Sequence, residues 1–270
     1  MQYTDVALFS DLDGTLFDSS RRVSPENRAA LARFIRAGGQ FGISTGRAAE
    51  NALVMLPDVP INAWSVVLNG AAAYHYGRKT TAAERELPKE SMERLIRWVL
   101  AEMPEVNVQL CSDHGLLFVS RHEYADADFV NSHQPLVEMS LEDALRFRWL
   151  KVLFCAPRKM LEILHRYAME NGYTGIMESV YSSEVYLEFL PQGVSKGACL
   201  RELRKLPELK GKTFIAIGDY TNDLELLQVA DVAVAVGNAL PEVKEIADYI
   251  VCRNDDHAIA DLIDRLIPLL

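Results

Sequence analysis

Two carboxylates follow the first apolar segment of this sequence, with one residue between them. Asp11 and Asp13 follow the run at 6–9 after a single serine, and this run has the unbroken apolar character of a strand buried on both faces of a parallel sheet. In an extended chain, residues two apart point the same way, so both carboxylates are expected on one face. Anions held side by side raise each other's pKa unless a cation lies between them or one binds a proton. Taken alone, the pair would be explained better by a strand end with an Asp-Gly turn and a capping aspartate.

Other polar residues lie at the ends of further apolar segments. The residues in such positions are Asp11 and Asp13, Thr45 and Arg47, Asn69, Asp219, Asn222 and Asp223, and Asn238. Ligands of an open parallel sheet bind in the crevice at the carboxyl ends of its strands, so these side chains converge if the strands share one sheet. Four carboxylates would then lie near Lys196 and Arg47. Such hard oxygen ligands favour a hard cation, and Mg²⁺ is usually held by one or two carboxylates, water and a substrate phosphate.

Two cations occupy positions that a helix dipole disfavours. Arg47 directly precedes a helix expected at about 48–55, and Lys196 lies in the first turn of a helix capped by Ser195. The amino end of a helix favours anions. An exposed side chain at small energetic cost explains Arg47 as well as a bound anion does, and both interpretations stay open for the residue alone.

The elements that must position these residues alternate between strands and helices at both ends of the chain. Strands are expected at 6–9, 40–44, 64–68, 213–217 and 232–236. A helix begins after Ser24, a favourable N-cap residue, with Pro25 at its first position, and Gly38 and Gly39 end it. This alternation predicts an α/β core with a parallel, Rossmann-like sheet.

From about residue 84 the pattern changes to short strands joined by turns and separated by helices. Strands are expected at 106–111, 116–120, 149–156 and 185–190, and helical segments at 89–101, 123–131 and 158–171. Adjacent strands on short turns indicate an α+β unit with a largely antiparallel sheet. We therefore predict a core domain formed by residues 1–83 and 188–270, with an inserted domain at 84–187. Asp113 and His114 lie on the turn between the first two of these strands, where a plain hairpin turn and a contact with a ligand both explain them.

The composition excludes several classes of protein. The chain has 270 residues, of which 49% are hydrophobic and 24% charged, as in ordinary globular proteins. A net charge of −10 without a Lys/Arg-rich block argues against nucleic-acid partners. The four cysteines are widely spread, as expected of thiols in a reducing compartment. No apolar run approaches the ~20 residues of a membrane span, and no signal-peptide pattern is present. We expect a cytoplasmic protein without membrane partners, monomeric or weakly dimeric.

The sequence resembles the haloacid dehalogenase superfamily of phosphatases. The matching motifs, in order, are Asp-Leu-Asp-Gly-Thr-Leu at 11–16, Ser-Thr-Gly-Arg at 44–47, Lys196, and Gly-Asp-Tyr-Thr-Asn-Asp at 218–223. The segments at 69–71, 194–197, 236–239 and 254–256 are similar to those of the Cof-type branch. By its position and length, the insertion resembles the type B form of the C2 cap domain in that superfamily.

This resemblance implies a role for each candidate residue. Asp11 is the implied nucleophile, which forms an aspartyl-phosphate, and Asp13 protonates the leaving oxygen and then activates water. The implied phosphate-binding residues are Thr45, Gly46, Arg47, Lys196 and Asn222. The implied Mg²⁺ ligands are Asp11, the backbone carbonyl of Asp13, Asp219 and Asp223. Together they imply Mg²⁺-dependent hydrolysis of a small phosphorylated metabolite, such as a sugar phosphate.

Two alternative functions share these motifs in part. A phosphomutase of the phosphomannomutase type would have a similar cap and core, and would return the phosphoryl group to a sugar. A signalling receiver module also uses an aspartate cluster, a threonine and a lysine, but the Asp-x-Asp spacing, the 270-residue length and the large insertion argue against it. The substrate and the cap residues that select it are not determined by the motifs.

Overall fold

The computed structural model describes residues 1–82, 84–112, 115–120 and 137–270, and the chain forms two compact units. Unit 1 comprises Met1–Ala83 and Ser195–Leu270, and unit 2 comprises Glu84–Val194. The predicted boundary after residue 187 is wrong, because strand β11 (Tyr186–Pro191) pairs with strands of unit 2 on both sides. The segment at 123–131 and the two candidates Asp113 and His114 lie outside the described residues.

Unit 1 is built on a parallel sheet with the strand order β14-β13-β12-β1-β2. The strands are β1 (Val6–Ser10), β2 (Gln40–Ile43), β12 (Thr213–Gly218), β13 (Val232–Ala235) and β14 (Tyr249–Ile250). All pairs are parallel, which confirms the predicted α/β core. Every residue of β1 is buried, as its unbroken apolar sequence predicts for a central strand covered on both faces.

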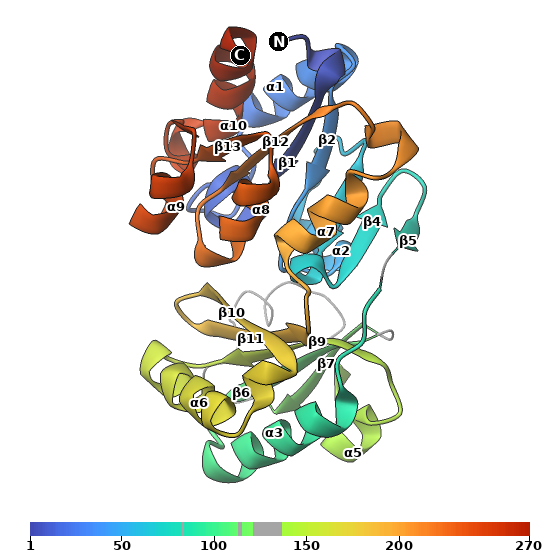
Figure 1. Cartoon of the computed structure of the whole chain (residues 1–270), viewed down its shortest axis with the longest axis vertical. Helices are drawn as coiled ribbons and strands as arrows, with labels where there is room; N and C mark the ends of the chain where they lie inside the picture. The colour runs from blue at the N-terminus through green and yellow to red at the C-terminus, as the bar shows by residue number, and fades with distance from the viewer. Residues whose placement is uncertain (83, 113–114, 121–136) are drawn as a thin grey trace. The chain divides into compact units, whose positions relative to one another are not determined.

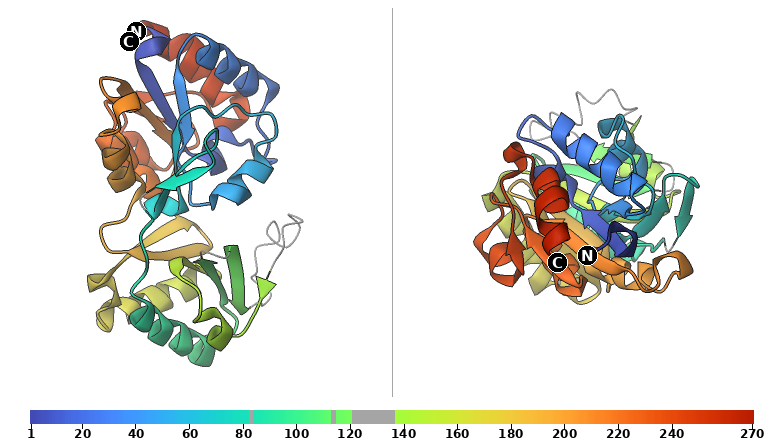
Figure 2. Two further views of the ribbon diagram at one scale, coloured as in Figure 1. Left: turned by 90° about the vertical axis from the view of Figure 1, so that its right-hand side faces the viewer. Right: turned by 90° about the horizontal axis from the view of Figure 1, so that it is seen from above.

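Helices cover both faces of this sheet. They are α1 (Pro25–Arg36), α2 (Ala49–Met55), α7 (Lys196–Leu203), α8 (Leu224–Val229), α9 (Pro241–Ile246) and α10 (Ala258–Asp261). Figures 1 and 2 show α1 and α10 on one face, and α7 and α8 on the other. This follows from right-handed crossovers that run in opposite directions along the sheet, from β1 to β2 and from β12 to β13. Short 3₁₀ and π-helical turns complete the unit at Tyr3–Asp5, Leu12–Leu16, Leu68–Gly70, Pro207–Leu209, Thr221–Asp223, Asn254–Asp256, Leu262–Leu266 and Ile267–Leu269.

The predicted helix caps are present. The side chain of Ser24 accepts a hydrogen bond from the backbone N–H of Asn27 at 3.2 Å, with Pro25 as the first residue of α1. Ser195 accepts one from the backbone N–H of Ala198 at 2.9 Å and begins α7. Because such caps satisfy otherwise unpaired N–H groups, they fix where each helix starts, and the cap of α7 thereby fixes the position of the next residue, Lys196.

The strand predicted at 64–68 is not a regular member of the parallel sheet. Strand β3 (Trp64–Val67) pairs antiparallel with β4 (Ala72–His75), which pairs antiparallel with β5 (Thr80–Ala82). A single parallel bridge joins Ser44 to Val66, and the backbone N–H of Thr45 donates to the carbonyl of Val66 at 2.9 Å. This contact still brings the turn after β3 beside the residues that follow β2.

Unit 2 is an α+β unit with the strand order β10-β11-β9-β6-β7-β8. Its remaining strands are β6 (Asn107–Ser112), β7 (Gly115–Ser120), β8 (Val137–Glu138), β9 (Trp149–Cys155) and β10 (Met177–Ser183), and its helices are α3 (Lys89–Glu102), α5 (Leu141–Ala144) and α6 (Arg158–Glu170), with a 3₁₀ turn at Tyr173–Gly175. All pairs except β7–β8 are antiparallel. Helices α3 and α6 lie along one face of the sheet (Figure 1). Unit 2 has its own apolar core, separate from that of unit 1.

Two features of unit 2 do not appear in the sequence pattern. Strand β10 was not expected, because its sequence, MESVYSS, is mostly polar and forms no apolar run. Most of its residues are half-buried in the structure. The sheet also contains a buried ion pair, with 2.9 Å between Lys151 Nζ and Glu188 Oε2. Across the described parts of both units, none of the helices combines the length and apolar character needed to span a membrane.

Candidate active site

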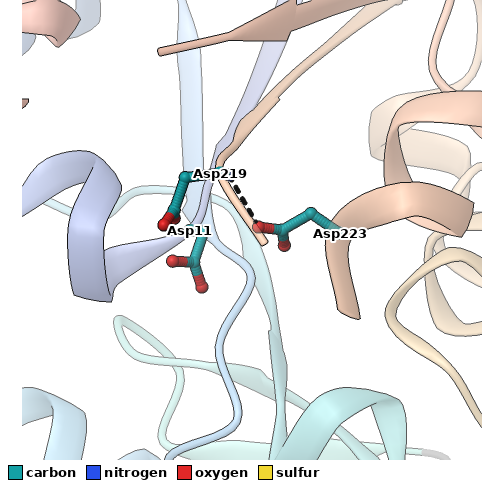
Figure 3. A group of neighbouring side chains, drawn as sticks. All are labelled: Asp11, Asp219 and Asp223. Atoms are coloured by element: carbon teal, nitrogen blue, oxygen red, sulfur yellow. Dashed lines mark hydrogen bonds between the residues drawn. The ribbon is translucent and has the colours of Figure 1, made fainter. Parts of the chain in front are cut away.

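The site lies at the carboxyl edge of the parallel sheet in unit 1. Strands β1 and β12 are neighbours, and the chain leaves them in opposite directions along the sheet, toward β2 and toward β13. Such a switch point leaves a crevice between the loops that follow the two strands. Asp11 follows β1, and Asp219 and Asp223 follow β12. Figure 3 shows the three carboxylates turned toward one another, as the convergence argument predicts.

A tight turn after β1 joins the two sides of this crevice. Gly14 has a φ of +83°, and a Cβ atom there would lie 2.4 Å from Asp219 Oδ2. Glycine is therefore required both by the backbone conformation and by the close carboxylate. The next residue, Thr15, donates its hydroxyl hydrogen bond to Asp219 Oδ1 at 2.7 Å. The turn thus fixes Asp219 in place relative to Asp11.

Lys196 lies among the carboxylates and is completely buried. Its Nζ donates to Asp11 Oδ1 at 2.7 Å and to Asp223 Oδ1 at 2.6 Å, and neither Lys196 nor Asp223 exposes its side chain. Burial alone would lower the pKa of Lys196, but the two carboxylates outweigh it and raise the pKa above its usual range. The cation in the first turn of α7 is therefore held by these anions.

One lysine does not neutralise three closely spaced carboxylates, of which Asp11 and Asp223 are buried and Asp219 is half-buried. Burial, opposed by Lys196 and reinforced by Asp223 and Asp219, raises the pKa of Asp11 well above its usual value. Burial and the charge of Asp223 raise the pKa of Asp219 to about 7. One oxygen from each of Asp11, Asp219 and Asp223 lies within 4.8 Å of the others. Excess negative charge on closely spaced hard oxygens fits a divalent cation, so the donor set agrees with the expected metal site.

Asp13 forms an ion pair with Arg47. Strand β1 ends at Ser10, so strand alternation does not place Asp13 beside Asp11. Its carboxylate is 45% exposed and accepts two hydrogen bonds from Arg47, at 2.8 Å from Nε and 2.7 Å from a terminal nitrogen. Desolvation would raise the pKa of Asp13, but the Arg47 charge and hydrogen bonds outweigh it and lower the pKa below its ordinary value. Arg47, which precedes α2, thus has a carboxylate partner in this structure.

The remaining candidates surround the turn after β3. Thr45 is fully buried, and its hydroxyl accepts a hydrogen bond from the backbone N–H of Arg47 at 3.1 Å. Asn222 donates to the side-chain oxygen of Asn69 at 3.1 Å. A Cβ atom on Gly46 would lie 3.1 Å from the Asn69 amide. Asn69 therefore lies between the segments that carry Thr45 and Asn222, although the motifs imply no role for it.

Two asparagines hold the backbone of the turn that follows Asp13. Asn238 donates to the carbonyl of Gly14 at 2.7 Å and accepts from the backbone N–H of Asn254 at 3.0 Å. The Asn254 side chain donates to the carbonyl of Phe17 at 2.9 Å. Asn238 was expected at this edge of the sheet, whereas the contact of Asn254 with residue 17 was not, because nothing in the sequence connects segments so far apart.

The fold and this site define a Rossmann-like α/β core with a carboxylate–lysine centre at the carboxyl edge of its parallel sheet. The chain belongs to the haloacid dehalogenase-like hydrolase family, whose model matches residues 8–263. This confirms the family predicted from the four motifs, and with it the predicted class of enzyme.

Individual relatives agree over nearly the full length. The chain is 26% identical over 293 residues to phosphatase YwpJ of Bacillus subtilis, covering 95% of this chain and 98% of the relative. It is 27% identical over 241 residues to an HMP-PP phosphatase of Serratia proteamaculans, covering 87% and 85%. The crystal structure of a haloacid dehalogenase-like hydrolase from Bacteroides thetaiotaomicron matches with a TM-score of 0.82 at 26% identity, covering 97% of this chain and 99% of that one.

Proposed function

We propose that this chain is a Mg²⁺-dependent phosphatase that hydrolyses a small phosphorylated metabolite through a phosphorylated Asp11. The observation that carries this proposal is the position of Asp11 at the end of β1, held by Lys196 beside two further carboxylates. Phosphoryl transfer depends mainly on positioning and on neutralisation of charge. A fixed carboxylate with a buried cation and a cation-binding group of oxygens supplies both.

The proposed reaction has two steps. An oxygen of Asp11 attacks phosphorus and the bond to the leaving oxygen breaks, while Asp13 gives that oxygen a proton. Asp13 then takes a proton from water, which attacks phosphorus and releases Asp11 and inorganic phosphate. Arg47 pairs with Asp13 in this structure and lowers its pKa. We propose that Arg47 moves onto the phosphoryl oxygens when substrate binds, so that Asp13 can hold the proton that it gives to the leaving oxygen. Lys196, Thr45, Gly46 and Asn222 are the other proposed contacts of those oxygens.

Asp11 and Asp219 are the proposed direct ligands of Mg²⁺, together with the backbone carbonyl of Asp13. Of the carboxylate oxygens, Asp11 Oδ2 and Asp219 Oδ2 accept no hydrogen bond from any residue that the structure describes. Both oxygens of Asp223 accept hydrogen bonds, from Lys196 and from the backbone N–H of Asp219 at 3.0 Å, so Asp223 is proposed to help directly or through water. Bound Mg²⁺ would supply charge neutralisation for the phosphoryl group.

The leaving group is proposed to be small, in keeping with relatives such as the HMP-PP phosphatase. The assignment of unit 2 as a cap that selects the substrate stays a prediction. Release of inorganic phosphate from a panel of phosphorylated sugars, nucleotides and cofactors such as pyridoxal phosphate tests the function. Turnover of at least one monoester supports it. Transfer of phosphate to a sugar without net release, or no reaction with any member, would contradict it.

Removal of the metal is expected to abolish hydrolysis. Without a divalent cation, the carboxylates around Asp11 repel a phosphoryl group and one another, so excess chelator should leave no measurable turnover and added Mg²⁺ should restore it. Ca²⁺ is larger and often binds carboxylates in bidentate fashion, and should inhibit by engaging both Asp11 oxygens. Thermal unfolding provides a second readout, since Mg²⁺ should raise the Tm of the wild type and not that of Asp219→Asn. Full activity in excess chelator would show that hydrolysis does not depend on a divalent cation.

A further inference from the structure

The turn after β3 has an unfavourable backbone conformation. Leu68, Asn69 and Gly70 have φ values of +52°, +52° and +96° in succession. Asparagine tolerates this region better than most residues, whereas a leucine with positive φ is a genuine outlier. Leu68 and Asn69 are also nearly completely buried, at 6% and 1% exposure. Such strain persists only where the surrounding structure determines it, and it is concentrated at functional sites.

The surrounding contacts hold this turn against the loop that follows β2. The backbone N–H of Asn69 donates to the carbonyl of Thr45 at 3.0 Å, and that of Leu68 donates to the carbonyl of Arg47, also at 3.0 Å. A side chain on Gly46 would lie against the Asn69 amide. The strained turn and the segment 45–47 therefore form one packed unit.

The same turn contacts two other segments that carry proposed phosphate-binding residues. The backbone of Gly70 lies against the start of α7, since a Cβ atom there would be 2.0 Å from the carbonyl of Ser195 and 3.1 Å from the backbone nitrogen of Lys196. The Asn69 side chain accepts the hydrogen bond of Asn222 at 3.1 Å. Residues 68–70 thus link the loop after β2, the first turn of α7 and the turn after β12.

We propose that Asn69 is a positioning residue, which orients the amide of Asn222 and the loop of Thr45 toward the phosphoryl group; the inference rests on the proposed function. Glycine would fit the backbone at this position with less strain, so the backbone alone gives no reason for asparagine. Its side-chain oxygen is what glycine would lack. This role requires no contact between Asn69 and the substrate.

Asn69→Gly separates positioning from folding. Relief of the backbone offsets the lost hydrogen bond, so the Tm is expected to stay within ~3 °C of the wild type. The loss of orientation should lower kcat/KM by ~10- to 100-fold, mostly in kcat. The inhibition constant for inorganic phosphate in Mg²⁺ should rise by ~10-fold, as expected when a charge-assisted contact weakens. Unchanged kcat/KM would overturn the inference, and so would a Tm lower by more than ~10 °C, which would indicate a purely structural role.

Two controls isolate the side chain from the backbone. Lys79→Gly removes a side chain from an exposed residue with a similar φ, +51°, in the turn between β4 and β5, and should leave kcat/KM unchanged. Asn69→Ala loses the same amide but keeps an unfavourable φ, so it should match Asn69→Gly in kcat/KM with a lower Tm. Equal Tm values with unequal kinetics in that pair would contradict the inference.

A double-mutant cycle with Asn222→Ala tests the contact itself. If Asn69 acts through Asn222, the double variant should be no more than ~2-fold slower than the slower single variant. Fully additive losses would contradict this. Turnover by the wild type, with none by Asp11→Asn, establishes the proposed function independently. If the wild type proves inactive, the proposed function fails. Calorimetric binding of inorganic phosphate then still tests the role of Asn69, since phosphate should bind Asn69→Gly more weakly than the wild type, and equal binding would contradict that role.

Discussion

Asp11→Asn is expected to reduce turnover by at least ~10⁴-fold with every phosphomonoester, because it removes the proposed nucleophile. The size of the effect does not depend on the leaving group, since an amide cannot form the acyl-phosphate with any of them. Steady-state release of inorganic phosphate measures it. Asp5→Asn, at the exposed start of the same segment, is the control and should retain full turnover. Residual turnover of more than a few per cent in Asp11→Asn would place the nucleophile elsewhere.

The same substitution should stabilise the metal-free protein. The pKa of Asp11 is raised in the folded state, so the folded state binds a proton more tightly than the unfolded state does. Its ionisation therefore costs stability, and this cost is present at pH 8, above the ordinary pKa of a carboxyl group. Asn removes the charge, so Asp11→Asn should unfold at a higher temperature than the wild type in chelator at pH 8. A lower Tm there would show that the Lys196 ion pair outweighs the crowding of the carboxylates.

Lys196→Met is expected to lower both stability and activity. The substitution leaves Asp11 and Asp223 buried without a cation, and breaking a buried ion pair in this way costs ~3–5 kcal/mol. Loss of a positive charge at the phosphoryl site should also lower kcat by ~10²–10³-fold. Urea unfolding in chelator measures the first effect, and added Mg²⁺ should recover part of it because the metal ion neutralises the same carboxylates.

An exposed lysine provides the matched control for this substitution. Lys205 pairs with Glu202 at 2.8 Å, but its side chain is 69% exposed. Solvent screens such surface pairs, so Lys205→Met should change the free energy of unfolding by less than ~1 kcal/mol. Similar losses of stability from the two lysine substitutions would show that the buried Lys196 ion pairs stabilise the fold no more than an exposed pair does.

Much of this site could be predicted because each candidate follows an apolar strand. Asp11, Asp219 and Asp223 converge because parallel strands bring their carboxyl ends to one edge of the sheet. The apolar runs in the sequence are sufficient to predict where these strands end. Lys196 could be placed in the same way, because its helix has a recognisable cap at Ser195. Local chemistry and strand direction determine these positions, and both can be read from a sequence.

Other features depend on contacts between distant segments. The pairing of Asp13 with Arg47 joins residues that are 34 positions apart, and strand alternation gave no sign of it. The segment Asn69-Gly70 is typical of a turn. The positive φ values of Leu68 and Asn69 could not be predicted from it, because they depend on packing against residues 45–47. The domain boundary was misplaced for a similar reason, because the pairing partners of β11 determine to which unit it belongs.

The most direct test of the central claim is a rapid-mixing measurement on Asp13→Asn with nitrophenyl phosphate. Nitrophenolate leaves without a proton, so Asp11 should still be phosphorylated, whereas hydrolysis of the intermediate needs Asp13 to activate water. We expect a burst of nitrophenolate equal in amount to the enzyme, followed by a much slower phase, and mass spectrometry of the acid-quenched protein should find the phosphoryl group on Asp11. The burst should disappear when Asp11→Asn is added. A burst that survives this change would place the nucleophile at another residue, and a wild-type steady rate from Asp13→Asn would show that Asp13 is not the acid and base of the reaction.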